Sequence, residues 1–88
     1  MEIYGQFDRM LDTIEGDSTN GHWKRGSFVI VTGDEIERFV AFTFKKEDLF
    51  TTIPTLRKGQ RMKVRFFPES REFDGRYYTD LKCTAIDY

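Results

Sequence analysis

The sequence predicts an all-β domain of five strands, with one short helix between the third and fourth strands. Three observations indicate this fold class: β-branched and aromatic residues recur in short runs, turn residues separate the runs, and a single segment has helical character. The chain has 88 residues, and a folded domain of this size buries roughly 64% of its extended surface. One modest core is therefore expected, and residues 1–88 are predicted to form a single domain.

The first half of the chain is expected to supply three strands. Residues 3–14 form the first strand, and a polar loop at residues 15–22 follows it, with the turn signal Asn20-Gly21 near its end. Residues 23–32 form the second strand, which contains the β-branched and aromatic run at positions 28–31. Gly33-Asp34-Glu35 then turns the chain into a third strand at residues 37–44.

The second half is expected to supply the helix and two longer strands. The helix covers residues 46–50, because the residues from Thr51 to Pro54 stop it. A fourth strand covers residues 61–73, with a bulge at Pro68, and a fifth covers residues 76–86. Five strands in this order, with a helix in that connection, match the Greek-key OB-fold barrel. An SH3-like barrel ranks second, because it usually lacks a helix there.

Asp74-Gly75 is typical of a two-residue hairpin turn, which predicts the register of the last two strands. One face then pairs Phe73 with Arg76, Arg71 with Tyr78, Glu69 with Asp80, Phe67 with Lys82 and Arg65 with Thr84. The other face pairs Glu72 with Tyr77, Ser70 with Thr79, Pro68 with Leu81, Phe66 with Cys83 and Val64 with Ala85. The second face is apolar from Phe66 and Leu81 onward, so we expect Cys83 in the core. Tyr77 is also expected to be a core residue.

Composition excludes several classes of protein. One cysteine and one histidine rule out a disulfide framework and a Cys/His zinc site. The chain lacks an apolar run long enough to span a membrane and lacks a signal peptide, so a cytoplasmic protein without a membrane partner is expected. Ser70 and Cys83 have only His22 as a possible base, and neither a phosphate loop nor metal-ligand spacing is present. We therefore expect no enzyme, no catalytic residues, no bound metal, no cofactor and no small-molecule substrate.

The net charge of −1 hides a segregation of charge. Residues 1–44 contain eight acids and four bases, whereas residues 45–88 contain seven acids and ten bases. The densest basic stretch comprises Arg57, Lys58, Arg61, Lys63 and Arg65. Such a stretch is either a solvated strand face or a groove wall that follows a polyanion.

Aromatic residues make up 16% of the chain and alternate with cations at two places. Trp23, Lys24 and Arg25 lie where the first loop enters the second strand, and Arg71, Phe73, Arg76 and Tyr78 lie beside the last turn. The predicted register adds Lys63, Arg65 and Lys82 to that outer face. Aromatic rings stack on bases and cations contact phosphates, so these ten residues are the candidate site for single-stranded nucleic acid.

Several of these residues have alternative explanations. Trp23 is either a stacking platform or a plug at the end of the barrel, and Tyr78 beside Arg71 is a stacking platform or only a cross-strand pair. Phe39 and Phe67 are candidates for a subunit interface. Glu69 and Asp80 face each other. They share a proton or hold a cation, or they are neutralised by Arg71 and Lys82 beside them, or the bulge expected at Pro68 separates them.

Two motifs resemble the signature of a family of small bacterial and phage proteins known chiefly as a domain of unknown function. They are residues 20–30, which include Asn20-Gly21-His22-Trp23, and residues 69–80, which include Asp74-Gly75-Arg76-Tyr77-Tyr78. The resemblance covers essentially the whole chain and implies an OB fold similar to single-stranded-DNA-binding proteins. We therefore expect a non-enzymatic protein that binds single-stranded DNA, or alternatively RNA, with little sequence preference. The rival hypothesis is a protein–protein adaptor or a homo-oligomerising barrel that does not bind nucleic acid.

Overall fold

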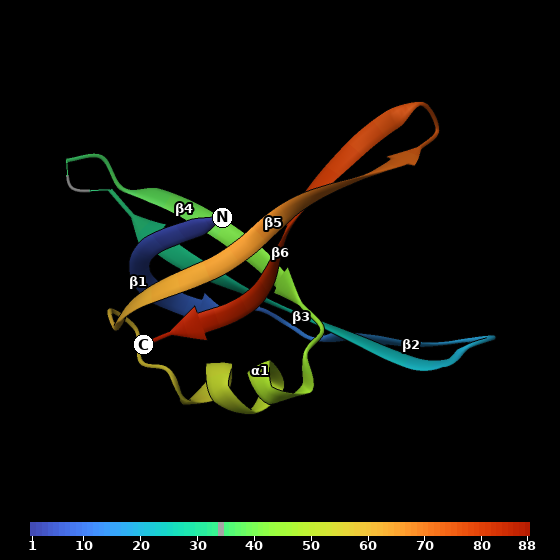
Figure 1. Cartoon of the computed structure of the whole chain (residues 1–88), viewed down its shortest axis with the longest axis horizontal. Coiled ribbons are helices and arrows are strands. Elements are labelled where there is room, and N and C mark those ends of the chain that lie inside the picture. Colours follow the sequence, from blue (N-terminus) through green and yellow to red (C-terminus); the bar gives the residue numbers. More distant parts are fainter. Residues whose placement is uncertain (34) are drawn as a thin grey trace.

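Eight elements follow one another along residues 1–33 and 35–88, the part of the chain that the computed structural model describes (Figure 1). In chain order they are β1 (Glu2–Met10), β2 (Ile14–Ser18), β3 (Gly21–Thr32), β4 (Arg38–Phe44), α1 (Glu47–Thr52), the 3-10 turn η1 (Ile53–Thr55), β5 (Arg61–Phe73) and β6 (Arg76–Asp87). The turn predicted at Gly33-Asp34-Glu35 includes Asp34, which is outside the described residues.

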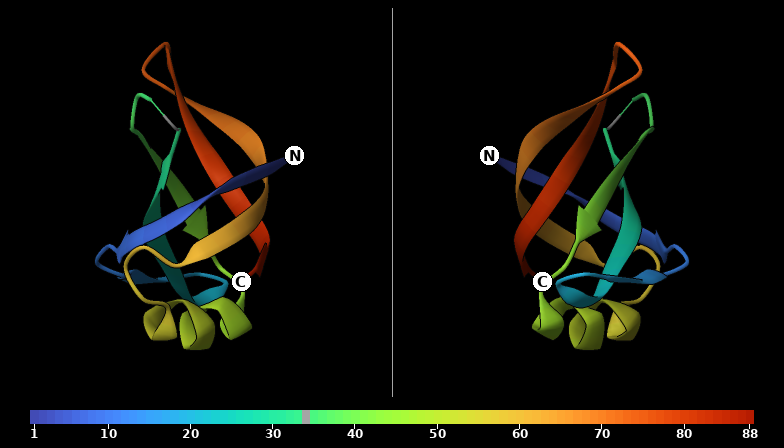
Figure 2. Two further views of the ribbon diagram at one scale, coloured as in Figure 1. Left: turned by 90° about the vertical axis from the view of Figure 1, so that its left-hand side faces the viewer. Right: turned by 90° about the vertical axis from the view of Figure 1, so that its right-hand side faces the viewer.

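The strands close into a barrel in the order β1-β5-β6-β4-β3, because β1 also pairs with β3, and β2 extends the sheet beyond β3. Neighbouring strands are antiparallel except β4 and β6, which meet in parallel at Thr43 and Lys82. This is the connectivity of an OB barrel with α1 between its third and fourth strands, so the predicted fold class is confirmed. Figure 2 shows α1 across one end of the barrel and the tip of the β5–β6 hairpin beyond the other end.

Aromatic side chains dominate the barrel interior. Phe28 and Phe42 are completely buried, and their ring centroids are 5.4 Å apart. Gly26 leaves room for a third buried ring, that of Phe44, because a Cβ atom at position 26 would overlap it. Cys83 is only 5% exposed, which confirms that it is a core residue.

The first strand and the loop after it differ from the prediction. β1 ends at Met10, and most of residues 15–22 lie in a hairpin formed by β2 and β3, with Thr19 and Asn20 at its tip. Gly21 follows the tip with a φ of 112°, an angle that glycine adopts without strain. The hairpin projects beyond the barrel (Figure 1), so its side chains need not be apolar, and hydrophobic periodicity did not reveal it.

The register of the β5–β6 hairpin is confirmed from the turn as far as the pair of Phe66 with Cys83. Beyond that pair a bulge shifts the ladder, so the two predicted pairs nearest the barrel end are wrong. The observed pairs are Arg65 with Ala85 and Val64 with Ile86. The shift occurs where β5 also begins to pair with β1, through Glu2 and Arg65.

Two further predictions about this hairpin are wrong. Pro68 pairs with Leu81 in a continuous ladder and is not a bulge. It lies beyond the last β1–β5 pair, on a strand edge, where a missing backbone N–H is tolerated. Tyr77 is 71% exposed rather than buried, because the ladder continues past the barrel as a projecting hairpin with two solvated faces.

The helical segment lies where it was expected but is longer. α1 ends at Thr52, and η1 continues it, with Pro54 in its first turn. A proline fits there because the first turn of a helix leaves its N–H groups without helical partners. No helix of the described residues is long and apolar enough to cross a membrane.

Candidate nucleic-acid interface

Two hairpin arms project from the same side of the barrel. The first arm is residues 14–25 of β2 and β3, and the second arm is residues 67–82 of β5 and β6. In the right-hand view of Figure 2 the outer surfaces of β3, β4 and β6 lie between the two arms. We call this surface the inter-arm face.

Four residues form a row that crosses the inter-arm face and ends on β5, through successive strand pairs. Ser27 pairs with Thr43, Thr43 pairs with Lys82, and Lys82 pairs with Phe67. Their side chains alternate with buried neighbours such as Phe28, so they point away from the core. Phe67 is 45% exposed and therefore presents an aromatic ring at the end of this row.

Trp23 and Arg25 continue the outer face of β3 onto the first arm. The indole of Trp23 lies over Gly16 of the paired strand, because a Cβ atom at Gly16 would lie 2.6 Å from Cζ2 of Trp23. The side chain is 42% exposed, so it is packed on the arm and not inside the end of the barrel. One surface of the only tryptophan therefore remains accessible to a ligand.

Two polar atoms on the inter-arm face are buried without a hydrogen-bond partner among the described residues. They are Nε of Arg25 and Oγ1 of Thr43. Buried polar groups in folded proteins are nearly always hydrogen-bonded, so these two atoms are exceptions, but both are covered, and a ligand could touch only other atoms of the two side chains. Sequence reasoning missed Ser27 and Thr43, because only strand pairing places them between the arms.

Lys24 lies on the opposite face of β3 from Trp23 and Arg25. Its Nζ atom is 4.1 Å from the ring centroid of Phe50 on α1, a cation–π contact that joins the first arm to the helix. Consecutive strand residues point to opposite faces, so the structure separates Lys24 from its two predicted partners.

The second arm brings together four predicted residues on one face. The register places Arg71 opposite Tyr78, and Phe73 opposite Arg76, on the same face of the hairpin as Lys82. All four are exposed, and neither arginine forms an ion pair within the described part of the chain. A shallow hollow at the end of this arm is lined by Arg71, Glu72, Phe73 and Tyr78.

An acidic pair interrupts this face. Glu69 and Asp80 are opposite each other, between the Phe67–Lys82 pair and the Arg71–Tyr78 pair. Asp80 Oδ2 lies 3.9 Å from Lys82 Nζ, so the acid partly neutralises the cation beside it. Glu69 forms no ion pair within residues 1–33 and 35–88.

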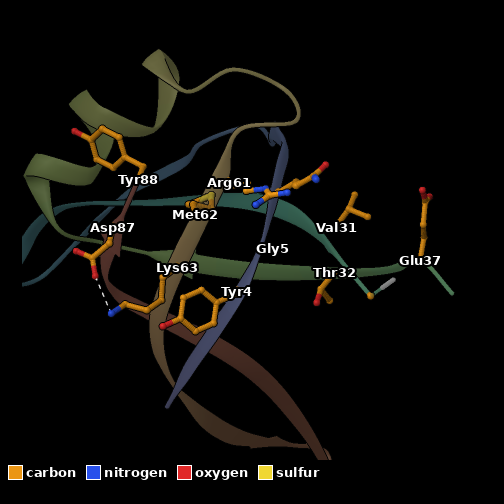
Figure 3. A pocket seen from close by; sticks show the side chains of 12 residues that line it. Tyr4, Gly5, Val31, Thr32, Glu37, Arg61, Met62, Lys63, Asp87 and Tyr88 are labelled. Atoms are coloured by element: carbon orange, nitrogen blue, oxygen red, sulfur yellow. Dashed lines mark ion pairs between the residues drawn. The ribbon is translucent and has the colours of Figure 1, made fainter. Parts of the chain in front are cut away.

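Lys63 and Arg65 lie elsewhere, where β5 pairs with β1. Lys63 Nζ is 3.1 Å from Asp87 and 3.9 Å from Glu2, and Arg65 Nε is 3.5 Å from Glu2. The hydrogen bond to Asp87 is the main reason why the pKa of Lys63 is raised, although desolvation opposes it. Figure 3 shows the ion pair of Lys63 with Asp87 in a groove beside Tyr4 and Tyr88. The structure thus does not bring these two cations together with the arms.

The described residues hold no arrangement typical of a metal site or a catalytic nucleophile. No group of three or more His, Cys, Asp or Glu side chains among them is placed to hold a metal ion. Burial raises the pKa of the Cys83 thiol to about 11, so the reactive thiolate is scarce at neutral pH. The imidazole of His22 is 3.0 Å from Asp17 on the first arm, away from both Ser70 and Cys83 in the fold.

A family model described as a domain of unknown function (DUF3127) matches residues 2–87. No curated protein sequence matches the chain. Among solved structures, the mitochondrial single-stranded DNA-binding protein Rim1 from S. cerevisiae is similar, with 19% identity and a TM-score of 0.74 over 99% of this chain and 90% of that one. A small single-stranded DNA-binding protein from Streptomyces coelicolor has 15% identity and a TM-score of 0.50, over 100% and 91% of the two chains.

Proposed function

The chain belongs to the DUF3127 family, whose description assigns no function, and we propose that it is a non-enzymatic protein that binds single-stranded nucleic acid. Single-stranded DNA is the favoured ligand, with little sequence preference. The observation that carries the proposal is the inter-arm face, which is flanked by exposed aromatic rings of both arms and by three arginines, Arg25, Arg71 and Arg76, that form no ion pair within the described residues. The similar folds of two single-stranded DNA-binding proteins support it.

Aromatic rings provide one part of the proposed binding energy. Trp23, Phe67 and Tyr78 are exposed on the inter-arm face or the second arm. Stacking contributes about 1–3 kcal/mol per base and tolerates any sequence, because every base has a π face. Three stacked bases would contribute roughly 3–9 kcal/mol before the cost of ordering the strand.

Phosphate contacts provide the other part. Arg25 and Lys82 lie on the inter-arm face, and Arg71 and Arg76 lie on the second arm. Four contacts to a single strand predict a slope of about −2.8 for log K against log salt, because each contributes about −0.7. Affinity should then fall roughly fifty-fold between about 50 and 200 mM salt.

Neighbouring residues of β3 allow a matched test of this assignment. Arg25→Ala and Lys24→Ala remove the same charge from opposite faces of one strand. Fluorescence anisotropy with labelled oligo(dT) should show that Arg25→Ala weakens binding and reduces the salt slope by about 0.7, whereas Lys24→Ala leaves both almost unchanged. Absence of binding at low salt, or equal effects of the two variants, would contradict the proposal.

A second candidate function is self-association through the groove of Figure 3. This groove is lined by the exposed rings of Tyr4 and Tyr88, by the acids Glu37 and Asp87 and by the cations Arg61 and Lys63. A surface with equal numbers of both charges can face its own copy across a two-fold axis, and tyrosine and arginine are enriched at interfaces. Sedimentation of the wild type and of Tyr4→Ala tests this candidate, which requires an oligomer that the substitution weakens.

A further inference from the structure

On one face of the second arm, a single acidic row interrupts three rows that each contain one cation. Starting at the barrel, the rows are Phe67 with Lys82, then Glu69 with Asp80, then Arg71 with Tyr78, and finally Phe73 with Arg76. Each row has one residue from β5 and one from β6, so the acidic row extends across the full width of the two-stranded arm. We infer that Glu69 and Asp80 select single strands against duplexes by interrupting the cationic surface. This inference rests on the proposed function.

The spacing of the rows explains why a duplex would be disfavoured. Residues two apart on one face of a strand are separated by about 6.7 Å, so the cationic rows on either side of the acids are roughly 13 Å apart. Duplex DNA is stiff, and each of its strands carries one phosphate per about 3.4 Å of helix axis. A duplex that contacts both cationic rows must therefore hold phosphates against Glu69 and Asp80.

A single strand can avoid this repulsion. Its backbone rotates freely enough to place phosphates at Lys82 and Arg71 while a base, rather than a phosphate, covers the acidic row. Phe67 and Tyr78 lie in the two adjacent rows and offer stacking partners for the flanking bases. Repulsion of the wrong partner by like charge is a common source of specificity at protein interfaces.

The two acids differ in their surroundings, which shapes the choice of variants. Glu69 is exposed and forms no ion pair in the described part of the chain, so Glu69→Gln removes a charge with little structural change. Asp80 contacts Lys82, so Asp80→Asn both removes repulsion and releases a cation. The control Glu15→Gln/Glu47→Gln removes the same net charge from an exposed position on β2 and from an exposed position on α1, which lies across the opposite end of the barrel from the tip of the second arm (Figure 2).

The experiment measures the affinity of each protein for oligo(dT) and for a duplex of equal length at about 50 mM salt. Glu69→Gln/Asp80→Asn should strengthen duplex binding on the order of tenfold and single-strand binding less than about threefold, whereas the control leaves the ratio unchanged. Glu69→Gln alone should give roughly a threefold gain for the duplex. Circular dichroism verifies that each variant is folded.

The outcomes distinguish failure of this inference from failure of the proposed function. Equal gains for both ligands, or the same gain in the control, overturn the inference and leave single-strand binding standing. Failure of the wild type to bind oligo(dT) overturns the proposed function and the inference together.

Discussion

Gly16→Ala is the most specific perturbation of the proposed stacking platform, because it moves Trp23 without removing it. The added Cβ atom would lie 2.6 Å from Cζ2 and 2.8 Å from Cε2 of the indole, so the ring has to leave its position on the first arm. The clash is with the far end of a side chain that is 42% exposed, and solvent is available for the ring to enter. The barrel core is therefore expected to remain intact.

The size of the effect follows from the contribution of one stacked base. Stacking contributes about 1–3 kcal/mol per base, and a displaced ring keeps part of it, so a loss on the order of 1–2 kcal/mol is expected. This corresponds to about five- to thirtyfold weaker binding of oligo(dT). The thermal midpoint should move by less than about 4 °C, since 1 kcal/mol shifts the midpoint of a domain of this size by about 4–8 °C.

The single tryptophan makes the perturbation visible in the same sample. Its emission reports the ring's surroundings, and anisotropy of labelled oligo(dT) reports affinity. Glu15→Ala is the matched control, because it changes the neighbouring residue on the other face of β2. A changed emission spectrum with unchanged affinity would refute the role of Trp23 in stacking. A large drop in the thermal midpoint would refute the expectation that Trp23 can move without disturbing the barrel core.

Three other predictions concern the core and the first arm. Gly26→Ala should destabilise the protein by about 1–3 kcal/mol in thermal unfolding, because its Cβ atom overlaps the buried ring of Phe44; an unchanged midpoint would contradict this packing. Lys24→Ala should lower the free energy of unfolding by about 0.5–1 kcal/mol through loss of its contact with Phe50, measured by urea titration; a stability equal to the wild type would show that the contact contributes nothing. The free energy of unfolding should fall as pH rises from about 9 to 11. Burial raises the pKa of Cys83 from 9.0 to about 11, so in that window the thiol ionises mainly in the unfolded chain. Cys83→Ala should show a shallower loss of stability over the same range.

Hydrophobic patterns and turn residues were sufficient to predict the fold and most of the β5–β6 register. The Asp74-Gly75 turn determines which residues pair next to it, and each later pair follows until a bulge occurs. The bulge near Arg65 depends on closure of the barrel against Glu2, which is distant in sequence, so turn chemistry did not predict it. The exposure of Tyr77 has a related origin, since pairing alone does not show where the barrel ends and the arm begins.

The candidate site shows the same division between local and long-range information. The separation of Lys24 from Arg25 follows from strand alternation and was available from the sequence once the residues were assigned to a strand. The row that joins Thr43 to Lys82 depends on one parallel pair between β4 and β6, which turn signals do not specify. The first arm was not predicted, because hydrophobic periodicity detects buried strand faces and a hairpin outside the barrel buries few side chains.

The near-neutral charge of the chain constrains how the proposed interface would work. Lys63 and Arg65 are compensated by Glu2 and Asp87, and Asp80 lies beside Lys82, so the basic excess of residues 45–88 is only partly available to phosphates. Electrostatic attraction is therefore limited, and the aromatic rings must supply a large share of the affinity. Salt removes the phosphate contribution but not the stacking contribution, so affinity extrapolated to about 1 M salt isolates the latter. Trp23→Ala should then lower this extrapolated affinity with little change in slope, whereas Arg71→Ala should mainly change the slope.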